Sequence, residues 1–297
     1  MLPRNCIIGV DIGTTSVKVV AFADDGQEIT RHSARLETYH DTPDAAEQDP
    51  QAVYETVTRS LARVSSSASA MGYRVTRLGL STAMHSLICI SDQNEPLSRA
   101  IIWMDTRSQK EAQDLWDSPA GISIYKRTGT PIHPMSPLAK LLWLRNRQPN
   151  LFAQTSKFVS LKEFIWYQWF HEWQVDESIA SATGLYNLKL RFWDEQALAL
   201  VGLTSHHFSQ LVSTTFIRSG VLDKTLLAQG ISAPTIFNIG ASDGVLANLG
   251  LHSTETTTMV LTIGTSLAVR IGSTELYTDE RTRPFCYVLD DHRYILG

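Results

Sequence analysis

The residues best suited to chemistry form a short polar turn near the N-terminus. The turn separates two apolar runs, 7–10 and 17–22, and consists of Asp11, Ile12, Gly13, Thr14, Thr15 and Ser16. A hairpin tip alone explains a glycine and several hydroxyls. A carboxylate at the end of an apolar strand, however, costs free energy unless it meets a cation or several donors. A metal-bound phosphate beside exposed backbone N–H groups supplies both, so the turn favours a phosphate site with Asp11 on the metal.

A second copy of this turn lies far along the chain. An apolar run from Met259 leads through Thr262 into Gly264, Thr265 and Ser266, and another apolar run follows. Two copies so far apart suggest two similarly built halves, each with one phosphate loop. Because Thr262 stands where the first copy has Asp11, only the first copy is expected to work with a metal.

Further polar residues come at the ends of predicted elements. Asp243 lies between two glycines at a loop-to-helix junction, where an N-cap is the simplest interpretation. Met84 and His85 follow a strand, at the end where open α/β sheets place ligands, although a core histidine explains His85 as well. Asp105 and Arg107 flank a turn and could form a plain surface ion pair.

One loop is stiffened by the three prolines Pro131, Pro134 and Pro137. A loop of this kind positions ligand groups at a small cost in entropy. His133 within it is a candidate substrate neighbour, and a purely structural role fits it equally well.

The elements that must position these residues follow from the apolar patterns. Strands are expected at 7–22, as a hairpin, and at 27–38, 75–80 and 87–90, and a second hairpin at 258–271. Asp49-Pro50 predicts a helix start, with apolar residues at helical spacing through 53–64. Helices are also expected at 108–117, from 138 onward, and at 162–170, where the aromatic residues indicate core. Alternating strands and helices predict an α/β fold.

Composition narrows the class of protein. The chain has 297 residues, 43% hydrophobic and 19% charged, with a net charge of −4, which argues against nucleic acid or an anionic membrane as a partner. Three cysteines without paired spacing suggest neither disulfides nor a zinc site. No apolar run is long enough to span a bilayer and no signal peptide is evident, so we expect a cytoplasmic protein. Its oligomeric state is left open, with a homodimer as one option.

Together these motifs resemble a known family. The turn Asp11–Ser16 looks like the first phosphate motif of the actin-like, ribonuclease-H-like ATPase superfamily. This resemblance implies a ribonuclease-H-like fold, in which a mixed sheet is flanked by helices. Within it, the Met-His pair, the triplet Trp-x-Asp-x-Arg at 103–107 and the pattern Met-x-Pro-x-x-Lys-x-x-Trp-Leu at 135–144 resemble the FGGY carbohydrate kinases. The amino-acid sequence of the loop 128–137 is most similar to that of the corresponding loop in the gluconate kinases. Asp243 also precedes the second glycine turn at the distance found for the general base of this family.

The resemblance implies a function and a division of the chain. It implies ATP- and Mg²⁺-dependent phosphorylation of a sugar or sugar acid, most specifically D-gluconate to 6-phosphogluconate, with xylulose as the alternative substrate. Residues 1–250 would be the N-terminal domain and 251–297 the start of a second, truncated domain, so that the chain as written is expected to bind sugar weakly and to turn over ATP inefficiently. A non-catalytic sugar-binding remnant is the alternative from another class. A chaperone-like or cytoskeletal actin-fold ATPase is disfavoured, because it leaves the sugar motifs unexplained.

The resemblance also implies roles for individual residues. Asp243 would be the catalytic base, and Asp11 would hold Mg²⁺. ATP phosphates would contact Gly13, Thr14, Thr15, Ser16, Gly264, Thr265 and Ser266. Substrate would contact Met84, His85, Asp105, Arg107 and His133. Of the Asp105 and Arg107 pair, Asp105 is the favoured sugar contact, while Arg107 would hold Asp105 or meet a substrate carboxylate.

Overall fold

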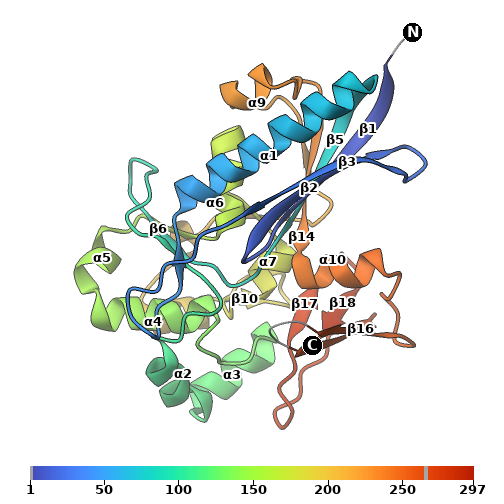
Figure 1. The fold of residues 1–297 in the computed structure, drawn as a ribbon. Helices are drawn as coiled ribbons and strands as arrows, with labels where there is room; N and C mark the ends of the chain where they lie inside the picture. The colour runs from blue at the N-terminus through green and yellow to red at the C-terminus, as the bar shows by residue number, and fades with distance from the viewer. Residues whose placement is uncertain (1–2, 264–266) are drawn as a thin grey trace.

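A mixed sheet organises the computed structural model, which describes residues 3–263 and 267–297 (Figure 1). The sheet has six strands in the order β13-β14-β5-β1-β2-β3. Their bounds are β1 Arg4–Ile12, β2 Ser16–Ala23, β3 Glu28–Arg35, β5 Tyr73–Thr82, β13 Ile217–Arg218 and β14 Ile236–Ser242. β5 runs parallel to both β1 and β14, whereas β2, β3 and β13 pair antiparallel with their neighbours. The predicted α/β fold with a mixed sheet is confirmed.

The first hairpin forms because its apolar residues alternate. β1 and β2 pair from Cys6 opposite Ala23 to Ile12 opposite Val17, so the turn between them consists of Gly13, Thr14 and Thr15. Every second side chain on each strand is buried. The hairpin was predicted correctly, whereas β3 is shorter than the predicted strand 27–38.

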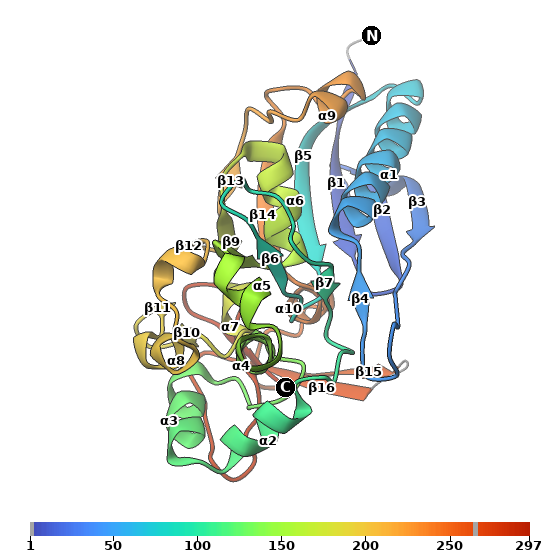
Figure 2. The ribbon, with the colours of Figure 1, turned by 90° about the vertical axis from the view of Figure 1, so that its left-hand side faces the viewer.

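Helix α1, Pro50–Ala70, covers one face of the sheet (Figures 1 and 2). Asp49 caps its first turn as predicted, because its carboxylate accepts from the N–H groups of Gln51 and Ala52. Its apolar residues pack into one cluster with the main sheet and with α6, Leu161–Phe170. Of the aromatic side chains of α6 that were assigned to the core, those of Phe164, Trp166, Trp169 and Phe170 are buried, whereas Tyr167 is half-buried.

Most of the remaining helices gather below the sheet, around a second hydrophobic cluster (Figure 2). They are α2 Gln109–Trp116, α3 Pro119–Thr128, α4 Pro137–Arg147, α5 Pro149–Gln154, α7 Glu177–Ser181, α8 Glu195–Val201, α10 Asp243–Gly250 and the 3₁₀ turn Ser205–His207. Helix α9, Lys224–Ala228, lies beside α1 instead, and its Leu226 belongs to the first cluster. Short strands join these segments in pairs: β4 Glu47–Gln48 with β7 Ala100–Ile101, β6 Ile88–Ile90 with β8 Lys157–Val159, β9 Gln174–Asp176 with β12 Gln210–Val212, and β10 Tyr186–Asn187 with β11 Phe192–Trp193.

A second, antiparallel sheet follows α10. Its order is β15-β16-β18-β17, with bounds Met259–Ile263, Leu267–Ser273, Tyr294–Leu296 and Cys286–Val288 respectively. The predicted hairpin 258–271 is β15 and β16, but its turn, Gly264, Thr265 and Ser266, lies outside the described residues. Several apolar side chains of this hairpin are exposed, as is usual at an uncovered sheet edge, and Ile263 is 75% exposed. Val260 is buried.

The two hydrophobic clusters do not divide the chain at residue 250. Cys286, Val288 and Ile295, which follow the proposed boundary, belong to the same cluster as α4 and α7, which precede it. The division into residues 1–250 and 251–297 therefore stays a prediction, and the strands after 285 share a core with residues 84–208.

Candidate active site

Parallel pairing brings the predicted phosphate and base residues to one edge of the main sheet. Asp11 on β1 lies opposite Ser81 on β5, and Ser242 at the end of β14 lies opposite Thr82. The Ser81 hydroxyl donates to Oδ1 of Asp11 over 2.8 Å. Because β1, β5 and β14 all end at this edge, Asp11 and Asp243 approach each other although they are far apart in sequence.

Asp243 is the first residue of α10, and Ser242, not Asp243, occupies the N-cap position. The N-cap interpretation of Asp243 is therefore wrong. Its Oδ1 accepts from the N–H of Gly244 over 2.7 Å. Burial raises the pKa of Asp243, the negative charge of Asp11 raises it further, and the Gly244 N–H and Arg270 oppose these effects. A carboxylate with a raised pKa is a stronger base, as proton abstraction requires.

The first turn is held from two sides. The N–H of Gly13 donates to the carbonyl of Ser16, and the Thr14 carbonyl accepts from Nε2 of Gln48. The Thr14 hydroxyl accepts from the indole of Trp103 over 2.8 Å, which ties the turn to the Trp-x-Asp-x-Arg segment. Among the described residues, the hydroxyl groups of Thr15 and Ser16 have no hydrogen-bond partner.

His85 lies in a strained turn directly after β5. Its φ is 70°, an uncommon value for a residue other than glycine. Its Nδ1 lies 2.9 Å from the carbonyl of Ala182, which can only accept, so Nδ1 carries the hydrogen. Burial lowers the pKa of His85 to about 3, with Lys140 adding to the effect. The ring is therefore neutral near pH 7, and Nε2 is an acceptor suited to a hydroxyl group. Met84 beside it is buried.

Lys140 was placed in the family pattern from the sequence but was given no role. It lies in the apolar first half of α4 and is 1% exposed. Its ammonium donates to three carbonyl groups, those of His85 at 2.5 Å, Ile101 at 3.2 Å and Ile102 at 2.9 Å. Lys140 therefore joins the His85 turn to the segment before Trp103. A lysine in the middle of an apolar helix was the signal in the sequence.

Replacing Lys140 by Met is expected to destabilise the protein by about 3–5 kcal/mol, because three buried carbonyl groups lose their donor. The matched control is Lys110→Met on α2, where the Lys110 side chain is 67% exposed and its ammonium pairs with Asp114. That change is expected to cost under about 0.5 kcal/mol. Urea unfolding followed by circular dichroism measures both. Equal midpoints for the two variants would contradict this role for Lys140.

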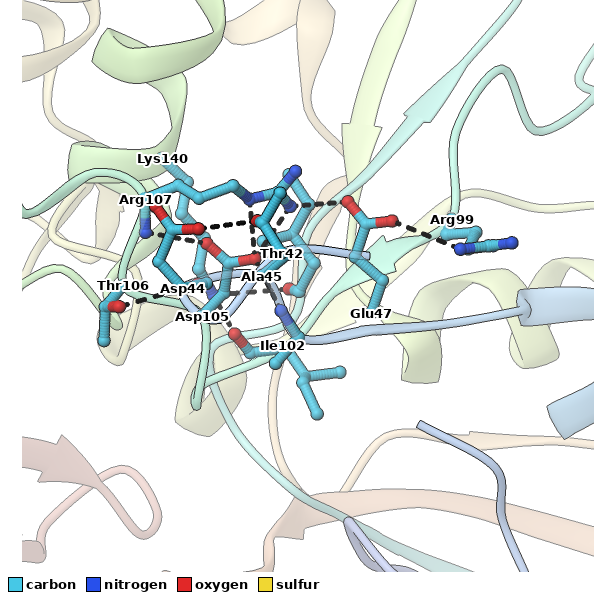
Figure 3. A network of polar contacts seen from close by, with 12 residues as sticks. Thr42, Asp44, Ala45, Glu47, Arg99, Ile102, Asp105, Thr106, Arg107 and Lys140 are labelled. Atoms are coloured by element: carbon cyan, nitrogen blue, oxygen red, sulfur yellow. Dashed lines mark hydrogen bonds and ion pairs between the residues drawn. The ribbon is translucent and has the colours of Figure 1, made fainter. Parts of the chain in front are cut away.

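Asp105 and Arg107 form the centre of a polar network rather than a surface pair (Figure 3). Asp105 is 1% exposed; its Oδ2 accepts from the N–H of Ala46 over 2.9 Å and from Nε of Arg107 over 2.9 Å. Arg107 also pairs with Glu47 and lies over the ring of Trp143. The surface interpretation is wrong, and Arg107 holds Asp105 as expected. Contact between Asp105 and a sugar stays a prediction.

His133 is exposed, and its Nδ1 accepts from the N–H of Met135 over 3.2 Å. Burial lowers the pKa of His133, and Lys140 adds to this effect. Contact between His133 and a substrate stays a prediction.

A buried ion pair holds the end of β14 in place. The sequence alone did not indicate this pair. Nζ of Lys162 lies 2.6 Å from Asp176, at 1% and 0% side-chain exposure, and also donates to the carbonyl of Ala241. At the next residue of β14, the N–H of Ser242 donates to the hydroxyl of Ser178 on α7. These contacts fix the two residues that precede Asp243.

The carboxylates at this edge fit a hydrated Mg²⁺ ion. Oδ1 of Asp11 bonds to Ser81, and Oδ2 has no hydrogen-bond partner within the described residues. In residues 3–263 and 267–297 no three or more His, Cys, Asp or Glu side chains converge as a metal cage. Mg²⁺ in phosphoryl-transfer sites commonly takes one or two carboxylates, with water and phosphate completing its shell. Asp11 is suited to that kind of site.

Comparison with known proteins supports the same family. A model described as the FGGY family of carbohydrate kinases, N-terminal domain, matches residues 6–250. The chain is 41% identical to a gluconokinase of Bacillus subtilis over 98% of its own length and 56% of that protein. Two solved structures from Lactobacillus acidophilus, a gluconate kinase and a ligand-bound xylulose kinase, each share a TM-score of 0.94 at 29% identity, over 98% of this chain and 59% of theirs.

Two further findings bear on the classification. The chain spans 56% of the length of its gluconokinase relative, so its match covers about half of such a protein. No helix among the described residues is long and apolar enough to cross a membrane. The family match over residues 6–250 agrees with the ribonuclease-H-like sheet and with the residues at its edge. The chain therefore belongs to the FGGY family of carbohydrate kinases.

Proposed function

We propose that this chain carries the sugar and phosphate sites of an ATP-dependent kinase that converts D-gluconate to 6-phosphogluconate. The observation that carries the proposal is the approach of Asp11 and Asp243 at one sheet edge, with electrostatic coupling between them. His85, Lys140 and the Asp105–Arg107 pair lie in the adjoining network. The 41% identity to a gluconokinase favours gluconate over xylulose.

The proposed reaction is transfer of the γ-phosphoryl group to a terminal hydroxyl. Asp243 takes the hydroxyl proton while the hydroxyl oxygen bonds to the γ-phosphorus, and the bond from that phosphorus to the β–γ bridging oxygen breaks to release ADP. The turn 13–16 would offer backbone N–H groups and hydroxyls to the phosphate oxygens. The same role is proposed for residues 264–266, by their resemblance to the first turn. Mg²⁺, when bound, neutralises phosphate charge, and Asp11 would hold it through water.

His85 and Met84 would contact the polyol chain in this proposal. A neutral Nε2 accepts a hydrogen bond from a sugar hydroxyl without adding a charge. Asp105, His133 and Arg107 are further candidates for contact with the sugar. Lys140 would position this site indirectly, because it holds the backbone carbonyl groups of His85 and Ile102.

A substrate panel tests the choice of sugar. With MgATP, the polypeptide that carries these residues is expected to release ADP in the presence of D-gluconate. Its kcat/KM for D-gluconate should be at least about tenfold above that for D-xylulose, a difference of roughly 1.4 kcal/mol. A coupled ADP assay measures both. A preference for xylulose would reject gluconate, and ADP release that ignores every sugar would reject the kinase function.

The alternative function, a sugar-binding protein without catalysis, is separated by calorimetry. Binding of gluconate together with binding of MgATP supports the kinase, since phosphoryl transfer needs both ligands at once. Sugar binding with no detectable nucleotide binding would support the alternative.

A further inference from the structure

Gln48 is a buried polar residue beneath the first turn, residues 13–16, and was not singled out from the sequence. It is 1% exposed. Its Nε2 lies 2.7 Å from the carbonyl oxygen of Thr14 and 3.4 Å from the hydroxyl of Thr38. A carbonyl oxygen only accepts hydrogen bonds, so the amide nitrogen of Gln48 must face Thr14. Gln48 therefore holds the carbonyl of Thr14 on the buried side of the turn.

The backbone on both sides of Gln48 is fixed by other contacts. Gln48 belongs to β4, which pairs antiparallel with β7. Before it, Glu47 exchanges two backbone hydrogen bonds with Tyr39 and pairs through its carboxylate with Arg107. After it, Asp49 caps α1. The position of the Gln48 amide is thus set by the surrounding fold and not by the turn that it contacts.

The bond from Gln48 also sets the direction of the next N–H group. In a trans peptide, the C=O and the N–H of the following residue point to opposite sides. Because the carbonyl of Thr14 points toward Gln48, the N–H of Thr15 points away from it, and Thr15 is exposed. Within residues 3–263 and 267–297 this N–H has no hydrogen-bond partner, whereas the carbonyl of Thr15 accepts from the N–H of Leu36 over 3.0 Å. The N–H of Thr15 is therefore available to bind an anion.

The space on the buried side of the turn is nearly filled. A cavity of about 10 Å³ lies there, lined by residues of the turn together with Gln48, Thr82 and Trp103. Such a volume holds about one water molecule and is too small for a phosphate group. A phosphate must therefore approach from the exposed side, which is the side to which the N–H of Thr15 points.

We propose that Gln48 is a positioning residue, which orients the peptide between Thr14 and Thr15 so that the N–H of Thr15 binds a phosphate oxygen of MgATP. This inference rests on the proposed kinase function and adds the residue that keeps one of its phosphate donors in place. Without Gln48, the carbonyl of Thr14 loses its donor on the buried side, which favours rotation of the peptide toward water. A carbonyl oxygen, which repels phosphate, then replaces the N–H donor.

Nuclear magnetic resonance of the chain with isotope-labelled threonine tests this assignment without catalysis. The probe is magnesium pyrophosphate, which carries phosphate groups without adenosine. In the wild type, the amide resonance of Thr15, assigned by its loss in Thr15→Ser, is expected to shift downfield as the N–H binds the anion. Gln48→Met should remove most of that shift. Gln48→Asn should do the same, because its amide is one methylene too short to reach Thr14.

Kinetics and calorimetry measure the effect on the reaction. Gln48→Met is expected to lower kcat/KM for MgATP about 10- to 100-fold, somewhat less than the outright loss of a donor. Gluconate affinity should stay within about twofold, because the contacts of Glu47 with the sugar network remain. The matched control is Gln51→Met, the same substitution at an exposed position of α1, where the side chain donates to Glu55. The control should equal the wild type in every measurement.

Three results would overturn the assignment. A Thr15 amide that does not respond to magnesium pyrophosphate in the wild type would show that this N–H is not a phosphate donor. An unchanged Thr15 shift in both Gln48 variants would show that the turn keeps its orientation without Gln48. Equal losses of gluconate and MgATP affinity would assign Gln48 to the general fold, which far-ultraviolet circular dichroism of each variant also checks.

Failure of the proposed function gives a different result. In that case the wild-type chain neither binds gluconate nor releases ADP with it. A Thr15 amide that still responds to pyrophosphate, and does so only with Gln48 present, would then support the role of Gln48 in a phosphate site of another function.

Discussion

Asp243→Ala is expected to lower kcat for phosphoryl transfer by about 10²- to 10⁴-fold, the usual contribution of a general base. Affinity for the sugar should stay within about tenfold, roughly 1.4 kcal/mol, because Asp243 acts mainly in the transition state. Asp243→Asn should show the same loss, since it keeps the size and removes the base. Burial and Asp11 raise the pKa of Asp243, so wild-type kcat should fall with decreasing pH at a value above the ordinary range of an aspartate.

The measurement is a coupled ADP assay over pH together with calorimetry of gluconate. Asp114→Ala is the matched control, because it removes one carboxylate from the exposed face of α2, where the Asp114 side chain is 64% exposed. That variant should match the wild type in kcat. Survival of activity in Asp243→Ala would show that another group takes the proton. If the residual kcat of Asp243→Asn still fell with decreasing pH at the same value, a group other than Asp243 would cause that fall, and the assignment would be wrong.

Asp176→Ala is expected to destabilise the protein by about 3–5 kcal/mol, because it leaves the ammonium of Lys162 buried without a counter-ion. The pair is 2.6 Å apart with side-chain exposures of 1% and 0%. Burial lowers the pKa of Lys162 and Asp176 opposes that shift, so the charge of Lys162 depends on its partner. Asp176 also accepts from the N–H of Ile179 at the start of α7, which adds to the loss.

Urea unfolding measures this effect, and Asp114→Ala again serves as the control. Breaking the exposed Lys110–Asp114 pair should cost under about 0.5 kcal/mol. Lys162→Met combined with Asp176→Leu should recover much of the loss, since two apolar groups leave no uncompensated charge. A double variant as unstable as Asp176→Ala would mean that packing, not charge, explains the effect.

Lys162 also connects stability to the candidate base. Its second bond goes to the carbonyl of Ala241, two residues before Asp243. A folded Asp176→Asn variant is therefore expected to lose kcat more than sugar affinity, because the base shifts while the polyol contacts stay in place. Lys162 and Asp176 are positioning residues in this account.

Local features of the fold could be read from the sequence. The alternation at 7–22 fixed the first hairpin, and Asp49-Pro50 fixed the start of α1, because these depend on the backbone preferences of neighbouring residues. Resemblance added the candidate base at Asp243. It did not show that Asp243 begins its helix and leaves the N-cap position to Ser242.

Contacts between distant segments could not be read in this way. Nothing near Lys140 in the sequence indicates that its ammonium meets carbonyl groups of residues 85, 101 and 102, and nothing near Asp105 indicates that Ala46 donates to it. Arg270 belongs with them, since its approach to Gly244 depends on how the second sheet packs against α10.

The sequence by itself determined the residue types, the strand–turn–strand units and the family. Only the tertiary structure decided which charges are buried, which are paired and which stay without a partner. The physical reason is range: backbone preferences act over a few residues, whereas desolvation and charge pairing depend on side chains brought together by the sheet. Asp11 and Asp243 are named by the sequence, but the parallel order β1-β5-β14 makes them one site.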